Sequence, residues 1–430
     1  MTTVVVGGGP AGLAATYALA GQDVVLLEPD VELGGLCRSF CVADCIFDLG
    51  GHAFFTKDAG VDRLISSELG VDCHTQPRNA WVSAYDRFVR YPFQAHLHGL
   101  PENVIEDCVN GILDAAEHPS AVPANFEEWV YAKFGAGIAE HFMLPYNRKL
   151  WGFPLTEIAP TWTQERIVQP EVQQVLTGAR NDRDHRDFPN ATVRYPSAGG
   201  FIELYRPLID FAMRFRRRAA LCELDLKRHE VITDSGDRLR FDHLISTMPL
   251  IELVAASKFV DPALSAASST LRYNSLALVS LVFDRPPQGP VARFHRIYCA
   301  DASVPFHKLV LNNNSSPYTA SAAGFGVQAE VSYSVAKNLP DEPLAEAVEA
   351  AIRNIGAADE RASVIACDIR HVKYAYPVQQ ADTRSIVETI AAFYRAHDVF
   401  LAGRFGEWKY INSDGAVRRG LSAADLVRTG

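Results

Sequence analysis

The sequence predicts an α/β protein whose first, parallel sheet is completed by segments that lie far apart in the chain. Three observations predict this class. The chain starts with an apolar run, a glycine turn and a helix-like stretch within its first 20 residues. Helical periodicity dominates from about residue 100 to 180, and short strand-like runs dominate from about 192 to 380. A late apolar run at 399–402 again ends in a glycine turn, which suits a strand that returns to the first sheet.

Length and composition are those of an ordinary globular protein of two or three domains. The 430 residues are 48% hydrophobic and carry a formal net charge of −10. This charge argues against nucleic acid or an anionic membrane as the main partner. No apolar run approaches the roughly 18 residues of a membrane span, and MTTVVVGGG does not have the pattern of a secretory signal. We therefore expect a cytoplasmic protein.

The eight cysteines are too sparse for a disulfide scaffold in so long a chain. Cys37, Cys41 and Cys45 follow one another at short gaps, but they lack a clear fourth ligand or a CxxC pair. We expect no metal site and interpret these cysteines as small hydrophobic residues.

The amino-terminal pattern is that of a dinucleotide-binding turn. The apolar run that ends at Val6 is followed by Gly7, Gly9 and Gly12 in the spacing GxGxxG, and then by a helix-like LAATYALA. The first glycine forms the turn, the second lets the backbone approach a pyrophosphate, and the third permits close packing of helix on strand. Glu28 ends the next apolar run and is placed to bind an adenosine ribose.

Two further segments favour FAD over NAD. ELGGLCRSF, with Gly34 and Gly35 before Arg38, resembles the second glycine pair of flavoproteins of the amine oxidase and protoporphyrinogen oxidase type. LAGRFGEWKYINSD resembles the carboxy-terminal segment with which such proteins return to the cofactor. The FAD contacts expected beyond the first turn are Gly35, Leu36, Arg38, Gly50, Gly51, His52, Arg404, Asn412, Ser413 and Asp414.

The expected organisation is a Rossmann-like FAD-binding domain that is discontinuous. Its three parts are 1–95, 192–265 (merging into the later sheet) and 391–430. A helical domain occupies 96–191, and an antiparallel β-sheet substrate domain occupies 266–390. Within the helical block, Asn125 and Glu128 resemble a capping pair, and Gly135 can end the helix that they start. Residues 229–249 are expected to form a strand, an SGD turn and two more strands, and 340–356 a helix outside the substrate sheet.

Several motifs together resemble the UDP-galactopyranose mutase family, especially its eukaryotic-type branch. In order along the chain they are GGH, YPFQ, PYNRKLWGFP, ER, PNAT, YPSAGG, STMP, AYP and GRFGEWKY, spread between residues 50 and 410. A general amine oxidase is expected to share the first glycines and the last turn, but not YPFQ or PYNRKLW. The resemblance implies an isomerase that interconverts the pyranose and furanose forms of a nucleotide sugar.

The resemblance also implies roles for individual residues. Tyr91, Phe93 and Gln94 would hold the pyrimidine, because two aromatic rings and an amide provide stacking area and hydrogen bonds. Asn147 and Trp151, four residues apart, would share one helical face near the ribose. Taken singly, each could equally be a core residue. The remaining substrate contacts expected are Arg78, Arg166, Asn190, Tyr298, Lys308, Tyr376 and Tyr410, and the catalytic residues are Gly51, His52, Arg166 and Lys308.

The chemistry that the resemblance implies belongs to reduced FAD, whose N5 attacks the anomeric carbon and displaces the nucleotide. No net oxidation occurs. A cellular reductant such as NAD(P)H is therefore an expected partner besides the nucleotide sugar. His52 in FDLGGHAFF lacks partners for a metal role and is interpreted as a residue that contacts the flavin near N5, with simple core packing as the alternative.

Three residues depart from the eukaryotic-type pattern. Lys308 replaces an arginine and Ser315 a tyrosine at the sugar-phosphate end, and Arg296 replaces a tryptophan near a mobile flap. Lysine keeps the charge but loses the planar fork that binds phosphate through two parallel hydrogen bonds. We therefore expect a retained reaction on a changed substrate, such as a 6-deoxy sugar, a pentose or a dTDP-linked sugar.

Two other functions are compatible with the same residues. One is an FAD-dependent oxidoreductase of the amine oxidase or protoporphyrinogen oxidase type, because a fold does not determine a function. The other is a flavoprotein that binds a nucleotide sugar without catalysis, which the changes at Lys308 and Ser315 make conceivable.

Overall fold

A parallel sheet assembled from distant parts of the chain forms the base of the molecule. The computed structural model describes residues 1–118, 122–182 and 191–429. The strand order of this sheet is β20-β13-β1-β2-β9. Its strands are β1 Thr2–Val6, β2 Asp23–Leu27, β9 Arg216–Arg217, β13 His243–Ser246 and β20 Val399–Leu401. The fold class and the discontinuity of this unit are confirmed.

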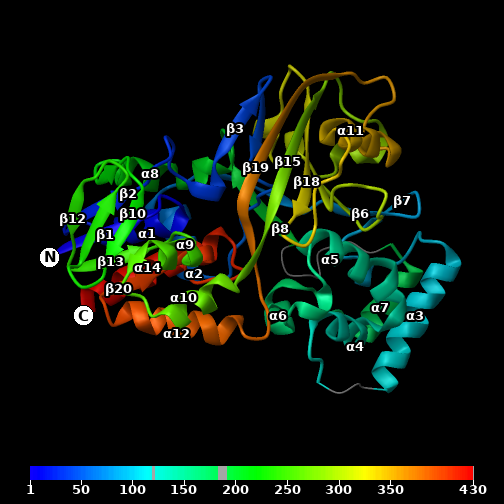
Figure 1. Cartoon of the computed structure of the whole chain (residues 1–430). Coiled ribbons are helices and arrows are strands. Elements are labelled where there is room, and N and C mark those ends of the chain that lie inside the picture. The colour runs from blue at the N-terminus through cyan, green and yellow to red at the C-terminus, as the bar shows by residue number, and fades with distance from the viewer. Residues whose placement is uncertain (119–121, 183–190, 430) are drawn as a thin grey trace.

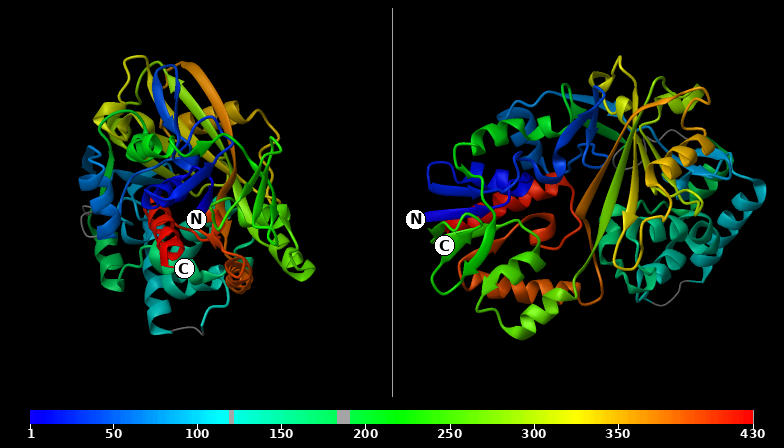
Figure 2. Two further views of the ribbon diagram at one scale, coloured as in Figure 1. Left: turned by 90° about the vertical axis from the view of Figure 1, so that its left-hand side faces the viewer. Right: turned by 45° about the horizontal axis from the view of Figure 1, so that its top comes forward.

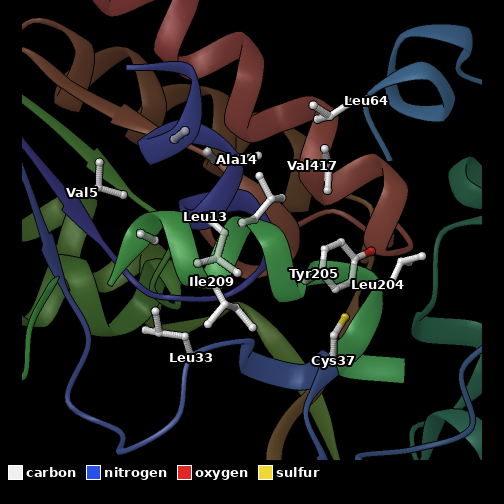
Figure 3. Close-up of a cluster of buried hydrophobic side chains, with 14 of the residues drawn as sticks. Val5, Leu13, Ala14, Leu33, Cys37, Leu64, Leu204, Tyr205, Ile209 and Val417 are labelled. Atoms are coloured by element: carbon white, nitrogen blue, oxygen red, sulfur yellow. The ribbon is translucent and has the colours of Figure 1, made fainter. Parts of the chain in front are cut away.

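Helices pack closely on the parallel sheet. Both views in Figure 2 show α14 (Ser413–Thr429) beside the amino-terminal segment that contains α1 (Pro10–Ala18). A side chain at Gly420 would place its Cβ 2.0 Å from the carbonyl oxygen of Ala11, so only glycine permits this approach. Leu13, Ile209 of α8 (Arg206–Ala212) and Val417 converge in the core between these helices (Figure 3).

A smaller sheet with the order β12-β11-β10-β14 borders the parallel sheet. Its strands are β10 Leu221–Asp225, β11 Glu230–Thr233, β12 Arg238–Arg240 and β14 Ser257–Lys258. The strands predicted at 229–249 are β11, β12 and β13, with Gly236 in the turn. Helices α9 Leu250–Ala256, α10 Pro262–Ser269, α12 Thr383–Arg395 and α13 Gly403–Gly406 complete this part.

The large sheet rises beside the parallel sheet, with the helical part below it (Figure 1). Its order is β19-β15-β18-β17-β16-β6-β7. The strands are β6 Ala80–Ala84, β7 Arg87–Arg90, β15 Arg272–Phe283, β16 Arg296–Cys299, β17 Lys308–Leu311, β18 Phe325–Tyr333 and β19 Val364–Val378. Neighbouring strands are antiparallel except β16 and β6, which are parallel.

Strands β6 and β7 extend the large sheet although they lie within 1–95, the expected first part of the cofactor domain. β6 pairs with β16, more than 200 residues later, in the register Tyr298 opposite Val82. Such a long-range pairing leaves no local pattern in the sequence. Residues 1–95 therefore contribute to both sheets.

The two faces of the large sheet differ in chemistry because side chains alternate along each strand. One face is apolar and packs against α11 (Leu344–Asn354), the helix predicted outside the sheet. The other face carries Tyr298, Lys308 and Glu330, which are neighbours across β16, β17 and β18. This polar row is the part of the sheet that serves the candidate site.

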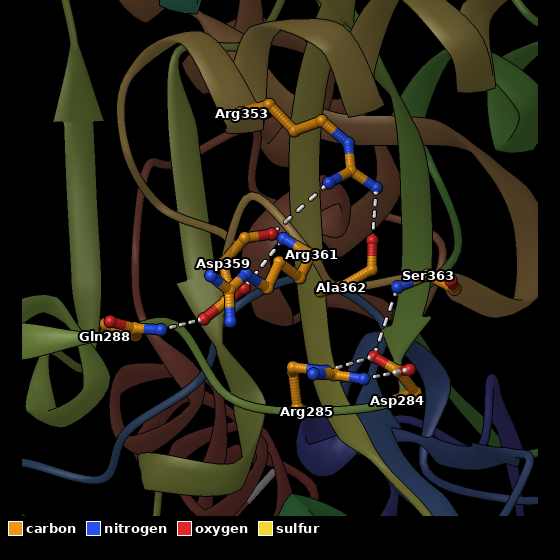
Figure 4. A network of polar contacts seen from close by, with 8 residues as sticks. All are labelled: Asp284, Arg285, Gln288, Arg353, Asp359, Arg361, Ala362 and Ser363. Atoms are coloured by element: carbon orange, nitrogen blue, oxygen red, sulfur yellow. Dashed lines mark hydrogen bonds and ion pairs between the residues drawn. The ribbon is translucent and has the colours of Figure 1, made fainter.

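A polar network fastens α11 and the loop that follows it (Figure 4). Arg353 donates to the carbonyl oxygens of Asp359 and Ala362, at 3.3 and 2.8 Å. Gln288 also contacts the Asp359 carboxylate, and Asp284 accepts a hydrogen bond from the backbone N–H of Ser363 at 3.1 Å. These contacts brace the apolar face of the sheet on the side away from the site.

The helical part contains α3 Glu102–Glu117, α4 Phe126–Ile138, α5 Leu144–Trp151, α6 Thr163–Arg166 and α7 Val172–Arg180. Asn125 and Glu128 cap α4 reciprocally: Asn125 Oδ1 accepts from Glu128 N at 3.0 Å, and Glu128 Oε1 accepts from Asn125 Nδ2 at 2.8 Å. Gly135 interrupts α4 with a φ of 71°, and the helix resumes after it. A Cβ there would lie 1.9 Å from the Gly111 carbonyl oxygen, so this glycine lets α3 and α4 touch.

The remaining elements are short. They are the hairpin β3 Ser39–Val42 and β4 Cys45–Asp48, the pair β5 Cys73–Pro77 and β8 Thr192–Pro196, and α2 Ala59–Arg63. Among the described residues, no helix has the length and apolar character needed to cross a membrane.

Candidate active site

A cavity of about 790 Å³ lies where the first glycine turn, the end of β2, residues 35–40 and the start of α14 meet. Most of the predicted cofactor residues line it: Gly7, Gly9, Glu28, Gly35, Leu36, Arg38, His52, Arg404, Asn412 and Ser413. Gly12, Gly50, Gly51 and Asp414 are not among its lining residues. The cavity therefore unites segments that are just over 400 residues apart in sequence.

The glycines of the first turn have the geometry that a diphosphate requires. Gly7 has a φ of +102°, and a Cβ there would lie 2.2 Å from Thr247 Oγ1. At Gly9 the nearest atom to an added Cβ is Gly35 Cα at 3.8 Å, so the backbone faces open space. Gly9 precedes α1 without a side-chain cap, and the free N–H groups of this helix start suit an anion. The residues present fit a dinucleotide.

Glu28 and Arg38 are held in place by the loop around the cavity. Glu28 Oε2 accepts a hydrogen bond from Gly8 N at 2.7 Å, which ties the predicted ribose contact to the glycine turn. Arg38 Nη1 pairs with Asp30 at 2.8 Å, and its Nε donates to the Gly35 carbonyl at 3.0 Å. Both side chains are thus ordered at the cavity by residues of the protein itself.

A Gly12→Ala substitution is expected to remove most of the bound cofactor and to destabilise the fold. The added Cβ would lie 1.8 Å from the Gly7 carbonyl oxygen, so β1 and α1 must separate. The check is the cofactor-to-protein absorbance ratio together with the thermal unfolding midpoint.

Gly236→Ala is the matched control, because Gly236 has a φ of +84° and open space around it. It should cost only about 1 kcal/mol and keep its cofactor. Full cofactor content in Gly12→Ala would contradict the assigned packing role.

His52 lies at the edge of the cavity, stacked on Phe201 with ring centroids 4.7 Å apart. Its Nδ1 is buried and has no hydrogen-bond partner among the described residues. Burial, with the charges of Arg404 and Lys308, lowers the pKa of His52 to about 3. The imidazole is therefore neutral at physiological pH, and it presents an unpaired nitrogen beside the predicted flavin position.

The pKa of His52 predicts how its replacement changes stability with pH. A histidine that is neutral when folded takes up protons on unfolding, so wild-type stability falls as pH drops from about 6.5 toward 3. His52→Phe keeps the ring stack without this loss. Relative to its value at pH 7.5, the free energy of unfolding of His52→Phe should gain about 2 kcal/mol over wild type by pH 5. Urea unfolding at both pH values is the measurement, and a difference that is independent of pH would contradict the neutral assignment.

Arg78 belongs to a second group of predicted site residues, which lie in an aromatic cluster of the core. Its Nη2 donates to Tyr298 Oη at 2.7 Å, and its guanidinium lies over the Tyr91 ring, 4.7 Å from the centroid. Tyr91 and Tyr298 stack with centroids 4.6 Å apart. The Nε of Arg78 is buried and has no hydrogen-bond partner among the described residues.

Arg166 contacts another tyrosine of the same aromatic cluster. Its Nη2 donates to the Tyr410 carbonyl at 2.6 Å, and its guanidinium lies 4.6 Å from the Tyr410 ring centroid. Trp151 and Tyr376 meet the Tyr410 ring edge-on, at 5.6 and 5.3 Å. Within the described part of the chain, Arg166 Nε and Trp151 Nε1 are also buried without a partner.

The cations around Tyr298 favour binding of an anion. Burial alone would raise the pKa of Tyr298, but Arg78, Arg296 and Lys308 together lower it. Arg296 lies two residues before Tyr298 on β16, so both side chains are on the same face of the sheet. The lowered pKa of Tyr298 thus indicates a positive electrostatic potential around its hydroxyl group.

Lys308 is less free than the sequence suggests. Its Nζ pairs with Glu330 Oε1 at 2.8 Å, and the same oxygen accepts a hydrogen bond from Gly51 N at 2.7 Å. Glu330 was not among the residues predicted for the site. The one available signal was a lone acidic residue in the otherwise mainly apolar strand VQAEV.

One residue contacts both the cofactor cavity and the aromatic cluster. Arg404 lines the cavity, and its guanidinium lies 5.4 Å from the Tyr376 ring centroid. Its Nε and Nη1 donate to the carbonyls of Ile411 and Ala375, at 2.8 and 3.0 Å. Arg404 thus connects the cofactor cavity with the aromatic cluster.

The residues predicted at the pyrimidine and ribose are mostly engaged in the core. Phe93 is fully buried and stacks on Phe142 at 4.8 Å. Gln94 Nε2 donates to the Val168 carbonyl, and Asn147 Nδ2 to the Met143 carbonyl, both at 2.7 Å. Asn147 and Trp151 share α5, as predicted from their spacing. Asn190 lies outside the described residues.

Comparison with known proteins defines the class. The family model of flavin containing amine oxidoreductases matches residues 10–428, so the chain belongs to this family and has a flavin cofactor site. A crystal structure of reduced UDP-galactopyranose mutase is 25% identical, covers 100% of this chain and 95% of its own, and has a TM-score of 0.95. The resemblance noted in the motifs is thereby confirmed at the level of the whole fold.

Two further proteins share the fold or a part of the sequence. A putrescine oxidase bound to putrescine is 16% identical over 100% of both chains, with a TM-score of 0.67, which shows the shared fold alone. Coproporphyrinogen III oxidase of Mycobacterium leprae is 36% identical over 137 residues, which are 31% of this chain and 27% of that protein. The match thus spans about a quarter of that relative's length.

Proposed function

We propose that the protein is a flavin-dependent isomerase that interconverts the pyranose and furanose forms of a nucleotide-diphosphate sugar. One observation carries this proposal. Two guanidinium groups, Arg78 and Arg166, lie over tyrosine rings of one aromatic cluster, each with a buried Nε that lacks a partner among the described residues. Buried donors without partners are costly, so a ligand with phosphate oxygens is expected between them.

Arg78 and Arg166 each have a defined role in this reaction. Arg78 and Tyr298 would bind one phosphate, and Arg166 the phosphate that leaves the sugar, where its charge stabilises the departing nucleotide. Tyr376 and Tyr410 can add phenolic hydrogen bonds. Trp151 and Tyr91 supply aromatic surface for the ribose and the pyrimidine.

Reduced FAD, when bound, would supply the nucleophilic electron pair at N5, which it would regain when the bond to the sugar breaks. The protein then has to orient the sugar and keep its neighbourhood in a fixed protonation state. His52 is suited to this because its imidazole stays neutral. A cellular reductant such as NAD(P)H would maintain the active state, which suits the cytoplasmic location that we propose.

The substrate is proposed to differ from that of the eukaryotic-type mutases. Lys308 is paired with Glu330, and Ser315 offers its carbonyl oxygen to Gln76 Nε2 at 2.6 Å. Arg296 instead brings a cation to the polar face of the sheet. These changes favour a 6-deoxy sugar, a pentose or a dTDP-linked sugar over UDP-galactose.

Turnover by the dithionite-reduced protein tests both parts. UDP-galactopyranose, dTDP-fucopyranose and a UDP-pentopyranose should be compared at equal concentration, with the furanose detected by chromatography. Furanose from any of them supports the isomerase, and none from all three would contradict it. UDP-galactopyranose as clearly the best substrate would contradict the changed specificity alone.

An FAD-dependent oxidoreductase is the second candidate, because the family model is that of amine oxidoreductases. Such an enzyme would reduce its flavin with an amine or a porphyrinogen and needs no diphosphate site. Binding distinguishes the two: UDP or dTDP should quench protein fluorescence in wild type, and Arg78→Met should weaken this binding at least tenfold. If Arg78→Met no longer binds the nucleotide but its flavin is still reduced by an amine or a porphyrinogen, the result would favour the oxidoreductase.

A further inference from the structure

Glu330 links the two halves of the site through one carboxylate oxygen. It lies on β18, fully buried, opposite Lys308 in the register with β17. Its Oε1 receives the Gly51 N–H at 2.7 Å and the Lys308 ammonium at 2.8 Å. Its Oε2 lies 3.4 Å from Nε2 of His307, longer than a normal hydrogen bond.

The charge on Glu330 is maintained by these neighbours. Burial alone would raise the pKa of this carboxyl, but Lys308 and the Gly51 N–H hold it well below its usual range. Burial lowers the pKa of His307 to about 4, so that imidazole is neutral at pH 7. The buried group is therefore an ion pair of Glu330 and Lys308 with no net charge.

The same oxygen also determines how the backbone enters the cofactor site. Gly51 immediately precedes His52, which lines the cofactor cavity. A Cβ at Gly51 would lie 2.5 Å from Val310 Cγ2 and 3.4 Å from Glu330 Oε1, so the peptide is pressed against the sheet. With its N–H bound to Glu330, the Gly50–Gly51 peptide has one orientation.

We propose that Glu330 is a positioning residue, which fixes the Gly51 peptide beside the flavin and neutralises Lys308 at the same point. The role in catalysis rests on the proposed isomerase function; the effect on the flavin does not. A charge imbalance at this pair should change the midpoint potential of the flavin. A nearby cation stabilises the reduced, anionic form, and a nearby anion destabilises it.

The midpoint potential of the bound flavin tests the proposal without any sugar. In Glu330→Gln the amide oxygen can still accept from Gly51, but Lys308 is left uncompensated, so the potential should become more positive. In Lys308→Gln the carboxylate is left uncompensated, so the potential should become more negative. The double variant should return close to wild type. Glu230→Gln, which removes a carboxylate paired with Arg238 at 2.6 Å in the smaller sheet, should leave the potential unchanged.

The outcomes separate this inference from the proposed function. Opposite shifts in the two single variants that cancel in the double variant support the inference, even if no sugar turns over. Shifts of the same sign in the two single variants, or no shifts, would overturn it, even if wild type proves to be a mutase. Should Glu330→Gln lose its flavin, Lys308→Gln carries the test alone, and an unchanged or more positive potential overturns the proposal.

A kinetic arm then tests positioning for the reaction itself. With flavin kept fully reduced by excess dithionite, Glu330→Met should lose kcat at least tenfold while KM changes less than threefold, because the Gly51 peptide is released. Glu330→Gln should keep more of the kcat than Glu330→Met, since it retains the acceptor. Equal losses in both variants would contradict the peptide-positioning role.

Discussion

An Arg166→Met enzyme is expected to lose turnover by a factor of about 10² to 10³ while it keeps its flavin. Arg166 holds its position through Tyr410, with a hydrogen bond of 2.6 Å to the carbonyl and a cation–π contact of 4.6 Å. Its Nε is buried and has no partner among the described residues, so it is available to the phosphate that we propose to leave the sugar. Steady-state kinetics on the reduced enzyme, with the flavin spectrum as a check on folding, is the measurement.

Arg148→Met is the matched control for Arg166→Met. Arg148 lies on α5, 56% of its side chain is exposed, and it pairs with Glu127 at 3.2 Å. An exposed pair of this kind contributes little, so both kcat and the thermal midpoint should stay close to wild type. Turnover of Arg166→Met within threefold of wild type would exclude Arg166 from the leaving-group site.

A Lys308→Met substitution is expected to destabilise the protein by about 3 to 5 kcal/mol. It leaves Glu330 buried with only the Gly51 N–H as a close partner. The pKa of Glu330 should then rise, and the loss of stability should be smaller at acidic pH, where the carboxyl can take up a proton. Thermal unfolding at pH 5 and pH 8 gives the two values.

The double variant Lys308→Met/Glu330→Leu distinguishes an unpaired charge from a simple cavity. Removing both partners of a buried ion pair is often close to neutral, so the double variant should recover most of the stability that Lys308→Met loses. Lys308→Arg should retain the pairing. A double variant that is less stable than Lys308→Met would show that packing, and not charge, dominates at this position.

The cofactor half of the site could be predicted because its signals are local. Gly7 and Gly12 each meet a steric requirement at a fixed spacing, Gly9 leaves the backbone open, and Glu28 directly follows the adjacent strand. The cap of α4 at Asn125 is local in the same sense, whereas Gly135, predicted to end this helix, only interrupts it. Such features depend on the backbone of a few neighbouring residues, which the sequence displays directly.

The substrate half was predictable only in part, because its contacts join distant strands. The partners of Glu330 are 22 and 279 residues away, and neither separation leaves a pattern in the sequence. Phe93 and Gln94 carry the residue types of a pyrimidine site, yet both are engaged with the helical part. The parallel pairing of β6 with β16 was missed for the same reason.

The central claim is that a reduced flavin isomerises a nucleotide sugar without net oxidation. The most direct measurement is anaerobic incubation of stoichiometrically reduced and of oxidised protein with the best substrate of the panel, following both the furanose and the flavin spectrum. We expect many furanose molecules per flavin in the reduced sample, with the flavin spectrum remaining that of the reduced form, and no product in the oxidised sample. Equal conversion in both samples, or reduction of the oxidised flavin by the sugar nucleotide, would contradict it.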